Sequence, residues 1–355
     1  MEILKILDFE QIKFIYKKTI EYLNLKMVYT SNVNNLFDLE KYSIKLTNFD
    51  IKTQYNYEIQ YVEKRKIYNE FLKELENQNY KDIFTHINTF YKLYKINDYK
   101  IYVSNNKGQD YIVIKNRKKI IIISGQRDES RCLLYIIRET VRIDSENNKN
   151  IIMHSSCLEI NNQNILIVGD SGSGKTTLLF QLLGKTDGKY ISNDRTIIDE
   201  NLRTYSFPLK IRLGAETVDN IGSLTSYLTI KNITEVSGRK KIMYPLNIKE
   251  WKSQSNSSIR PIKKIIIPEL LLKEENKIME ISEDEIRQNL EANCFTPNDP
   301  VWKNKWFMED YQNNDETIIK SKETIIEKLI RNTKKIKLNF NGVLDEKDLK
   351  KILED

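Results

Sequence analysis

The sequence predicts an α/β protein in which a core built around a strand, a glycine-rich loop and a helix follows an N-terminal α+β domain. The prediction rests first on residues 165–183, where an apolar run, a glycine-rich stretch and a second apolar run follow one another as strand, loop and helix. It rests second on length, because 355 residues can build two separate cores. No motif that carries chemistry occurs before residue 150. We therefore divide the chain into an accessory or recognition domain, 1–127, and a phosphate-binding domain, 128–355.

The glycine-rich stretch fits the pattern G-x-x-x-x-G-K-[ST], the signature of a P-loop. It consists of Gly169, Asp170, Ser171, Gly172, Ser173, Gly174, Lys175, Thr176 and Thr177, which we call the phosphate loop. Its three glycines let backbone N–H groups converge on phosphate oxygens, and the following helix adds the positive end of its dipole. The pattern predicts that Lys175 contacts the β- and γ-phosphates of a nucleotide and that the Thr176 hydroxyl binds Mg²⁺.

Composition narrows the class of protein and its partners. The chain carries a net charge of +7, and 26 basic and 20 acidic residues precede position 151, against 31 and 30 after it. The basic residues form no nucleic-acid-binding arm, since the densest cluster, 115–119, lies between two apolar runs and predicts a hairpin turn. Three cysteines far apart and two histidines argue against a zinc site and fit a reducing compartment. No apolar run approaches a membrane span, so we expect a cytoplasmic protein with no membrane partner.

The first 150 residues predict a mixture of helices and strands. The expected elements are a helix from Asp8 to about Leu23 with Asp8 as its N-cap, loosely alternating strands over 41–62, a helix over 63–78, strands over 100–104, 110–115 and 119–124, and a helix over 129–143 capped by Asp128. The 63–78 helix is expected to bury Tyr68, Phe71, Leu72 and Leu75, and the 129–143 helix Leu133, Leu134, Ile137 and Val141.

A histidine is expected beside the phosphate loop. The runs 151–160 and 165–168 flank Asn161–Asn164 and predict a hairpin with a four-residue turn. If Ile160 faces Ile165, His154 falls opposite Ser171. There it could bind phosphate, orient a nucleophile or move a proton, whereas the alternative is a structural histidine satisfied by the backbone.

Residues after the phosphate loop supply further candidates. The strand 189–192 ends at Asn193–Asp194, and a carboxylate at that position can reach Mg²⁺. Asp199 and Glu200 are expected to be turn residues. The remaining expectations are a strand over 207–212 with two cations on one face, a flexible basic loop over 236–241, an exposed excursion over 251–260, a buried strand over 262–272, a helix from the capping box Ser282–Glu285 to about Asn293, helices over 321–331 and 345–353, and a strand over 336–341.

With these residues in place, the region from about Ile151 to Pro268 resembles the HPr kinase/phosphorylase-like kinases. The resemblance rests on His154 in a hairpin before the phosphate loop, on the loop itself, on the polar pair 193–194 and on the Gly-Arg pair 238–239. It implies a P-loop kinase core of the HPr kinase/PEP carboxykinase-like type. It does not cover residues 1–125.

The resemblance also implies an activity and residue roles. It implies ATP- and Mg²⁺-dependent phosphorylation of a hydroxyl, commonly serine, on a protein or peptide, and relatives include kinases encoded with ribosomally made peptides such as lasso-peptide precursors. Lys175 would hold phosphate, Thr176 and Asp194 would hold magnesium, and Arg239 would stabilise the transferred charge.

One position departs from the family pattern. Relatives usually carry two adjacent aspartates after this strand, the first often assigned as the base, whereas this chain has Asn193. Either Asp194 serves metal and base, or His154 assists, or the loose transition state needs little base, or transfer is impaired. A small-molecule or RNA hydroxyl kinase and a nucleotide-gated binding module therefore remain alternatives.

The role of the first domain is also open. It could position a peptide acceptor, for example along an antiparallel edge near residues 100–124, or it could pack on the second domain and stabilise it or a homo-oligomer. The sequence names neither the acceptor nor a preference between ATP and GTP.

Overall fold

The structure is a computed structural model that describes residues 12–33, 39, 44–51, 53–86, 89–106, 108–126, 131–209, 211–214, 217–218, 221, 232–236, 239–245, 254–255, 257–299 and 310–354. It shows a mixed α/β protein that forms two compact units. The first unit comprises Met1–Asp144 and Asn298–Gln312, and the second comprises Ser145–Pro297 and Asn313–Asp355. This division differs from the expected boundary at 127/128, because most of α3 (Arg131–Asn147) and a segment late in the chain belong to the first unit.

The first unit is built on a nine-stranded sheet in the order β3-β1-β2-β4-β9-β8-β7-β6-β5. Its strands are β1 (Tyr16–Tyr22), β2 (Leu25–Ser31), β3 (Lys45–Asn48), β4 (Tyr57–Glu63), β5 (Tyr80–His86), β6 (Thr89–Ile96), β7 (Tyr99–Ser104), β8 (Tyr111–Asn116) and β9 (Lys119–Ser124). β2, β4 and β9 are parallel neighbours, and the other neighbouring pairs are antiparallel. Helix α2 (Arg65–Leu75) packs Tyr68, Phe71 and Leu75 against one face of this sheet.

Several expectations for this unit are confirmed. Helix α2, the strands β7, β8 and β9 and the tight 116–119 turn lie where the sequence places them. The four inward residues expected of the helix after residue 129 are buried in α3, although its expected cap Asp128 lies outside the described residues.

Two expectations for this unit are wrong. The expected helix through Leu23 is the strand β1, because pairing with β2 and β3 on its two sides buries Ile20 and Tyr22. The proposed start of that helix, Asp8, lies outside the described residues. Strands β7, β8 and β9 each have neighbours on both sides, so among the described strands none over residues 100–124 offers a free edge to a peptide. The edges among the described strands are β3 and β5.

The second unit contains another nine-stranded sheet, with the path β10-β14-β15-β19-β12-β11-β13, in which β21 also pairs with β19 and β20 pairs with β21. Its strands are β10 (Ile151–Met153), β11 (Ser155–Ile160), β12 (Gln163–Val168), β13 (Lys189–Ser192), β14 (Thr196–Ile198), β15 (Arg203–Ser206), β19 (Ser257–Leu270), β20 (Lys277–Met279) and β21 (Lys334–Phe340). β12, β19 and β21 run parallel, so their carboxyl ends meet at one edge of the sheet.

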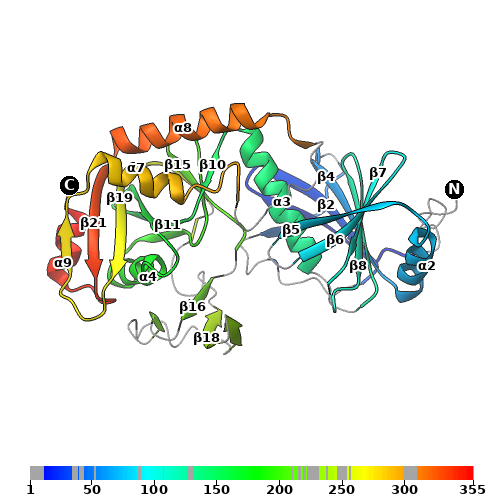
Figure 1. Ribbon diagram of the computed structural model, residues 1–355, viewed down its shortest axis with the longest axis horizontal. Coiled ribbons are helices and arrows are strands. Elements are labelled where there is room, and N and C mark those ends of the chain that lie inside the picture. The colour runs from blue at the N-terminus through cyan, green and yellow to red at the C-terminus, as the bar shows by residue number, and fades with distance from the viewer. Residues whose placement is uncertain are drawn as a thin grey trace. The chain divides into compact units, whose positions relative to one another are not determined.

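Helices cover both faces of this sheet (Figure 1). Helices α4 (Lys175–Lys185) and α9 (Glu346–Leu353) contribute to the core on one face, and α7 (Glu283–Ala292) and α8 (Asp315–Asn332) contribute to the core on the other. The second unit is therefore a three-layer α/β/α arrangement, in which a buried strand leads directly into the phosphate loop.

Helix ends in the second unit follow local capping signals. Ser282 caps α7 by accepting a hydrogen bond from the Glu285 N–H, as expected. Asp345 and Asp348 form a reciprocal capping box on α9. Helix α8 begins earlier than expected because the Asn314 side chain caps it at Thr317 N–H.

Three expectations in the middle of the second unit are wrong. Residues 207–209 are not a strand, since β15 ends at Ser206 and β16 (Arg212–Gly214) begins later. The expected basic loop is largely a hairpin of β17 (Asn232–Val236) and β18 (Arg239–Pro245), which form a three-stranded sheet with β16. The excursion over 251–260 ends early, because β19 starts at Ser257 in order to pair with β15.

Among the described residues, none of the helices combines the length and the apolar character that crossing a membrane requires.

Candidate functional site

The phosphate loop joins the carboxyl end of β12 to the first turn of α4. Gly172 and Gly174 have φ angles of 89° and 96°, in the left-handed region that favours glycine. Gly174 is the N-cap of α4, and a Cβ added there would meet Leu270 Cβ and Phe340 Cδ1 at 3.4 Å. The sequence therefore needs glycine where the backbone turns, and the turn leaves the N–H groups that begin α4 without helical partners, as an anion site requires.

Two polar side chains in this loop are arranged as a phosphate site would need. The Ser173 hydroxyl oxygen is buried and has no hydrogen-bond partner among the described residues. The Lys175 ammonium donates to the carbonyl oxygens of Gly169 at 2.6 Å and Asp170 at 2.9 Å. Burial lowers the pKa of Lys175 to about 8, although the carboxylates of Asp194 and Asp170 partly oppose this. The charged form of Lys175 would therefore be stabilised by a bound phosphate anion, because its present partners compensate only part of the cost of burial.

Asn193 lies where three elements meet. Its side-chain oxygen accepts hydrogen bonds from the hydroxyls of Ser156 in β11, at 2.8 Å, and Thr176 in α4, at 3.2 Å. An amide oxygen can accept from two hydroxyls without carrying charge, so Asn193 joins the end of β13 to the helix that follows the phosphate loop. Asn193 is thus the residue of the polar pair after β13 that contacts the Thr176 hydroxyl, whereas the sequence singled out Asp194 as the partner of Thr176 in holding magnesium.

His154 and Asp194 form the second half of the site. His154 Nε2 lies 3.5 Å from Asp194 Oδ1, and their side chains are 17% and 57% exposed. Asp194 adopts φ 70°, a left-handed conformation that aspartate tolerates better than most residues. Partial desolvation raises the pKa of Asp194, but the hydrogen bond from His154 and the charges of Arg195 and Lys175 outweigh it and hold that pKa below its usual range.

The hairpin that carries His154 differs from the expected one. Leu158, not Ile160, pairs with Ile165, and a two-residue turn, Asn161–Asn162, replaces the four-residue turn. Both asparagines have positive φ angles, of 51° and 61°, which match a tight hairpin turn. His154 lies just before β11, whose first residue Ser155 pairs with Val168, so the histidine stays next to the phosphate loop despite the shift.

No described contact brings Arg239, or either of the two cations expected on a strand over 207–212, to this site. Arg239 is the first residue of β18, and its side chain lies outside the described part of the chain, as does that of Arg212, while Lys210 is itself outside it. Asp199 is a turn residue, as expected, and its carboxylate accepts from the N–H groups of Asn201 and Arg203.

Sequence reasoning missed three residues of the site. Phe295 stacks on His154 with ring centroids 5.2 Å apart and an interplanar angle of 14°. Arg195 places its guanidinium 4.9 Å from the centre of the Phe295 ring, and Asn293 accepts a hydrogen bond from the His154 N–H. Residues 293 and 295 follow α7 and carry no motif, so no signal in the sequence ties them to His154.

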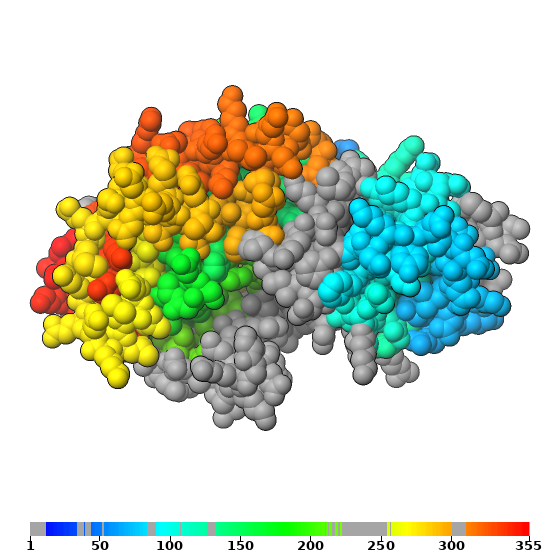
Figure 2. Space-filling view, viewed as in Figure 1, coloured from blue at the N-terminus to red at the C-terminus, as the bar shows by residue number. Residues whose placement is uncertain are grey.

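The donor set fits magnesium and a nucleotide. Thr176 and Asp194 offer a hydroxyl and a carboxylate, the hard oxygen ligands that Mg²⁺ prefers, and Mg²⁺ commonly takes only one or two protein ligands beside phosphate oxygens and water. In the described part of the chain, no group of three or more His, Cys, Asp or Glu side chains could hold a metal ion without other ligands. In the space-filling view, residues of the green part of the chain, to which the phosphate loop and α4 belong, lie at the surface beside the yellow-orange region that contains α7 (Figure 2).

Comparison with known proteins adds no assignment. No family model matches the chain, and no curated protein matches it. The chemistry of the site must therefore be argued from these residues.

Proposed function

We propose that this protein is an ATP- and Mg²⁺-dependent kinase with an HPr kinase/PEP carboxykinase-like core, which transfers the γ-phosphoryl group to a hydroxyl, such as that of serine or threonine, on a peptide or protein. The observation that carries the proposal is the position of Asn193–Asp194, whose first residue is 3.2 Å from the Thr176 hydroxyl directly after the phosphate loop. A P-loop, a helix-start hydroxyl and an acidic strand end are the parts that phosphoryl transfer uses in common.

Each residue has a role in this proposal. The N–H groups of the phosphate loop and Lys175 would hold the β- and γ-phosphates, and Thr176 and Asp194 would hold Mg²⁺, which would neutralise charge on the phosphate oxygens. The acceptor hydroxyl gives its proton to His154, which lies against Asp194. The acceptor oxygen forms a bond to the γ-phosphorus as the bond from that phosphorus to the bridging oxygen breaks, and ADP leaves.

The acceptor class comes from the resemblance, and the first unit suits it as a recognition module. In-line transfer depends more on placement than on covalent help from the protein, so an attached unit without catalytic motifs can contribute by positioning a polypeptide. A cytoplasmic location and an oligomeric assembly are compatible with this role and are part of the same hypothesis.

The test is transfer from γ-labelled ATP by the purified protein, with cell extract and with peptides encoded by neighbouring genes as acceptors. We expect label on a hydroxyl of a peptide or protein, and we expect Lys175→Ala to abolish it. Label in a metabolite or an RNA would instead support the alternative acceptors, and unchanged transfer by Lys175→Ala would refute the assignment.

One observation favours a second candidate. Asn193 cannot take a proton at neutral pH and is already engaged with two hydroxyls, so the chain could bind nucleotide and switch a partner without transfer. Tight binding of MgATP by a wild-type protein that labels no acceptor, combined with partner binding that depends on nucleotide, would favour this reading.

A further inference from the structure

A short segment after α7 contacts both halves of the site. We propose that Asn293 and Phe295 are positioning residues: Phe295 fixes the ring of His154 against Asp194, and Asn293 ties that histidine to the phosphate loop. The proposal rests on the kinase function above for its catalytic consequence, but its structural content stands on contacts that are independent of that function.

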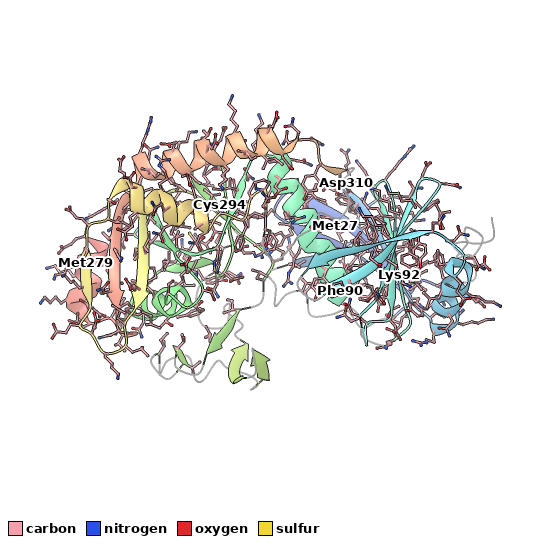
Figure 3. All side chains as sticks on the ribbon, in the orientation of Figure 1. Met27, Phe90, Lys92, Met279, Cys294 and Asp310 are labelled. Carbon is pink, nitrogen blue, oxygen red and sulfur yellow. The ribbon has the colours of Figure 1, made fainter. Side chains whose placement is uncertain are left out.

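The segment is anchored like an additional strand. Phe295 N–H donates to Ile152 O at 2.8 Å, and Ile152 N–H donates to the Thr296 hydroxyl at 2.9 Å. Cys294 forms an antiparallel bridge with Met153. Figure 3 labels Cys294 beyond the end of α7. The two residues that precede His154 are thereby paired with a segment that is far away in the sequence, so this segment can set the position of the histidine.

Phe295 controls the histidine ring. The two rings are nearly parallel, with centroids 5.2 Å apart, and His154 N–H donates to Asn293 O at 2.7 Å. Arg195 also lies against Phe295, at 4.9 Å from the ring centre. Phe295 therefore contacts both His154 and Arg195, two of the three residues that lower the pKa of Asp194.

Asn293 connects this histidine to the phosphate loop. It is 2% exposed, and its side-chain amide donates to Asn289 O at 3.0 Å and to the Asp170 carboxylate at 3.5 Å. One residue thus holds the His154 backbone through its carbonyl oxygen and a phosphate-loop side chain through its amide. Because α7 ends here, with Asn293 as its C-cap, the helix itself supports both contacts.

These contacts predict different kinetic defects for the two residues. Loss of the Phe295 ring should misplace His154 and lower kcat about 10-fold or more, with the KM for ATP changed less than about 2-fold, because small misplacements of a reacting group are costly. Loss of the Asn293 amide should act on the loop and raise the KM for ATP about 3-fold or more.

The primary experiment is histidine NMR of the full chain, which needs no turnover. The chain has two histidines, so His86→Gln assigns the His154 ring signals. At one fixed pH of about 8 for all variants, we expect Phe295→Leu to move the His154 ring protons downfield, since the stacked ring no longer shields them. Phe295→Tyr retains the ring and should restore both the shift and kcat.

The matched control is Phe207→Leu. Phe207 is the other aromatic residue against Arg195, at 5.4 Å, and it has no described contact with His154. Its loss should leave the His154 signals in place, and a downfield shift as large as that of Phe295→Leu would overturn the proposal. Unmoved His154 signals in Phe295→Leu, or a folded Phe295→Tyr as impaired as Phe295→Leu, would also overturn it. If the signals move as expected while the wild type labels no acceptor, the positioning stands and the kinase function fails.

Discussion

Lys175 is held by its own loop. Its ammonium donates to two loop carbonyls and is 7% exposed as a residue, so its charge is costly in the absence of an anion. The pKa of about 8 expresses that cost. The loop carbonyls offer this ammonium only dipoles, whereas a bound phosphate would offer it a full negative charge. Relief of the desolvation cost of Lys175 would therefore contribute to the free energy of phosphate binding.

This arrangement predicts a pH dependence of stability. The pKa of Lys175 is lowered from 10.5 to about 8, so the destabilising charge is fully present below pH 8 and is released as the pH rises from about 8 to 10.5. The wild type should gain up to about 3 kcal/mol over this window relative to Lys175→Met. Urea denaturation of both proteins at pH 7 to 10.5 measures it, and parallel curves would contradict the lowered pKa.

Exchanging aspartate and asparagine at positions 193 and 194 tests which side chain phosphoryl transfer needs. Asp194→Asn removes the carboxylate beside His154 and the proposed Mg²⁺ ligand, so phosphoryl transfer should fall about 100-fold or more. Asn193→Asp adds a possible base and can still accept from the two hydroxyl groups, but it places a second negative charge beside Asp194. Rates of label transfer at saturating MgATP compare the two. Higher transfer by Asn193→Asp would show that the native site lacks an optimal base, and full activity of Asp194→Asn would exclude its role.

At the scale of elements, the hairpin β11–β12 brings His154 to the phosphate loop. Its register is set by a two-residue turn in which Asn161 and Asn162 both adopt positive φ, so Ile160 pairs with Gln163. A one-residue slip would exchange the buried and opposite faces of both strands, including the strand that leads into the loop. Asparagine fits here because it tolerates the left-handed conformation better than other non-glycine residues.

The turn predicts a residue-specific stability change. Asn162→Val should lower the free energy of unfolding by about 1–2 kcal/mol, because a β-branched residue is strained at φ 61°. Asn162→Gly should be neutral or slightly stabilising. Urea denaturation provides the measurement, and Gln163→Val, in the extended first position of β12, is the control. Equal losses for the two valine variants would argue against the turn.

At the scale of the whole molecule, each unit draws on chain segments that are distant in sequence. The first unit includes residues 298–312, whose Asp310 accepts hydrogen bonds from Lys115 at 2.9 Å and from the Tyr57 hydroxyl at 2.9 Å. Helix α3 runs past the division at residue 144. A truncated protein that begins near residue 129 would therefore retain α3 but lack the first-unit sheet. To isolate the second unit, the chain should begin at residue 145, and a short linker should replace residues 298–312.

The Lys115–Asp310 pair predicts a large effect of a single change. The Lys115 side chain is fully buried and that of Asp310 is 16% exposed, so Asp310→Ala leaves a buried ammonium without its carboxylate. The free energy of unfolding should fall by about 3 kcal/mol, and Lys115→Met with Asp310→Ala should recover much of it. Glu70→Ala, which breaks the exposed Lys66–Glu70 pair, should cost less than about 0.5 kcal/mol. Denaturation curves that show equal losses for Asp310→Ala and Glu70→Ala would refute the buried pair.

The sequence by itself determined the features that local chemistry specifies. The phosphate loop, α2, the β7–β9 strands and the Ser282 cap of α7 follow from glycine spacing, helical or alternating periodicity and capping, all of which act over a few residues. The sequence also placed the pair 193–194 at the end of the strand that follows α4, and the structure has Asn193 there, 3.2 Å from the Thr176 hydroxyl.

Only the tertiary structure decided the rest. Residues 16–22 became a strand because two neighbours pair with them, which outweighs their helical spacing. The hairpin register depended on a turn two residues long rather than four. The contacts of Asn293 and Phe295 with His154, and of Asp310 with Lys115, join residues remote in sequence that carry no motif. Such contacts form because packing and hydrogen-bond satisfaction are properties of the folded chain, and no local pattern encodes which distant residue will meet them.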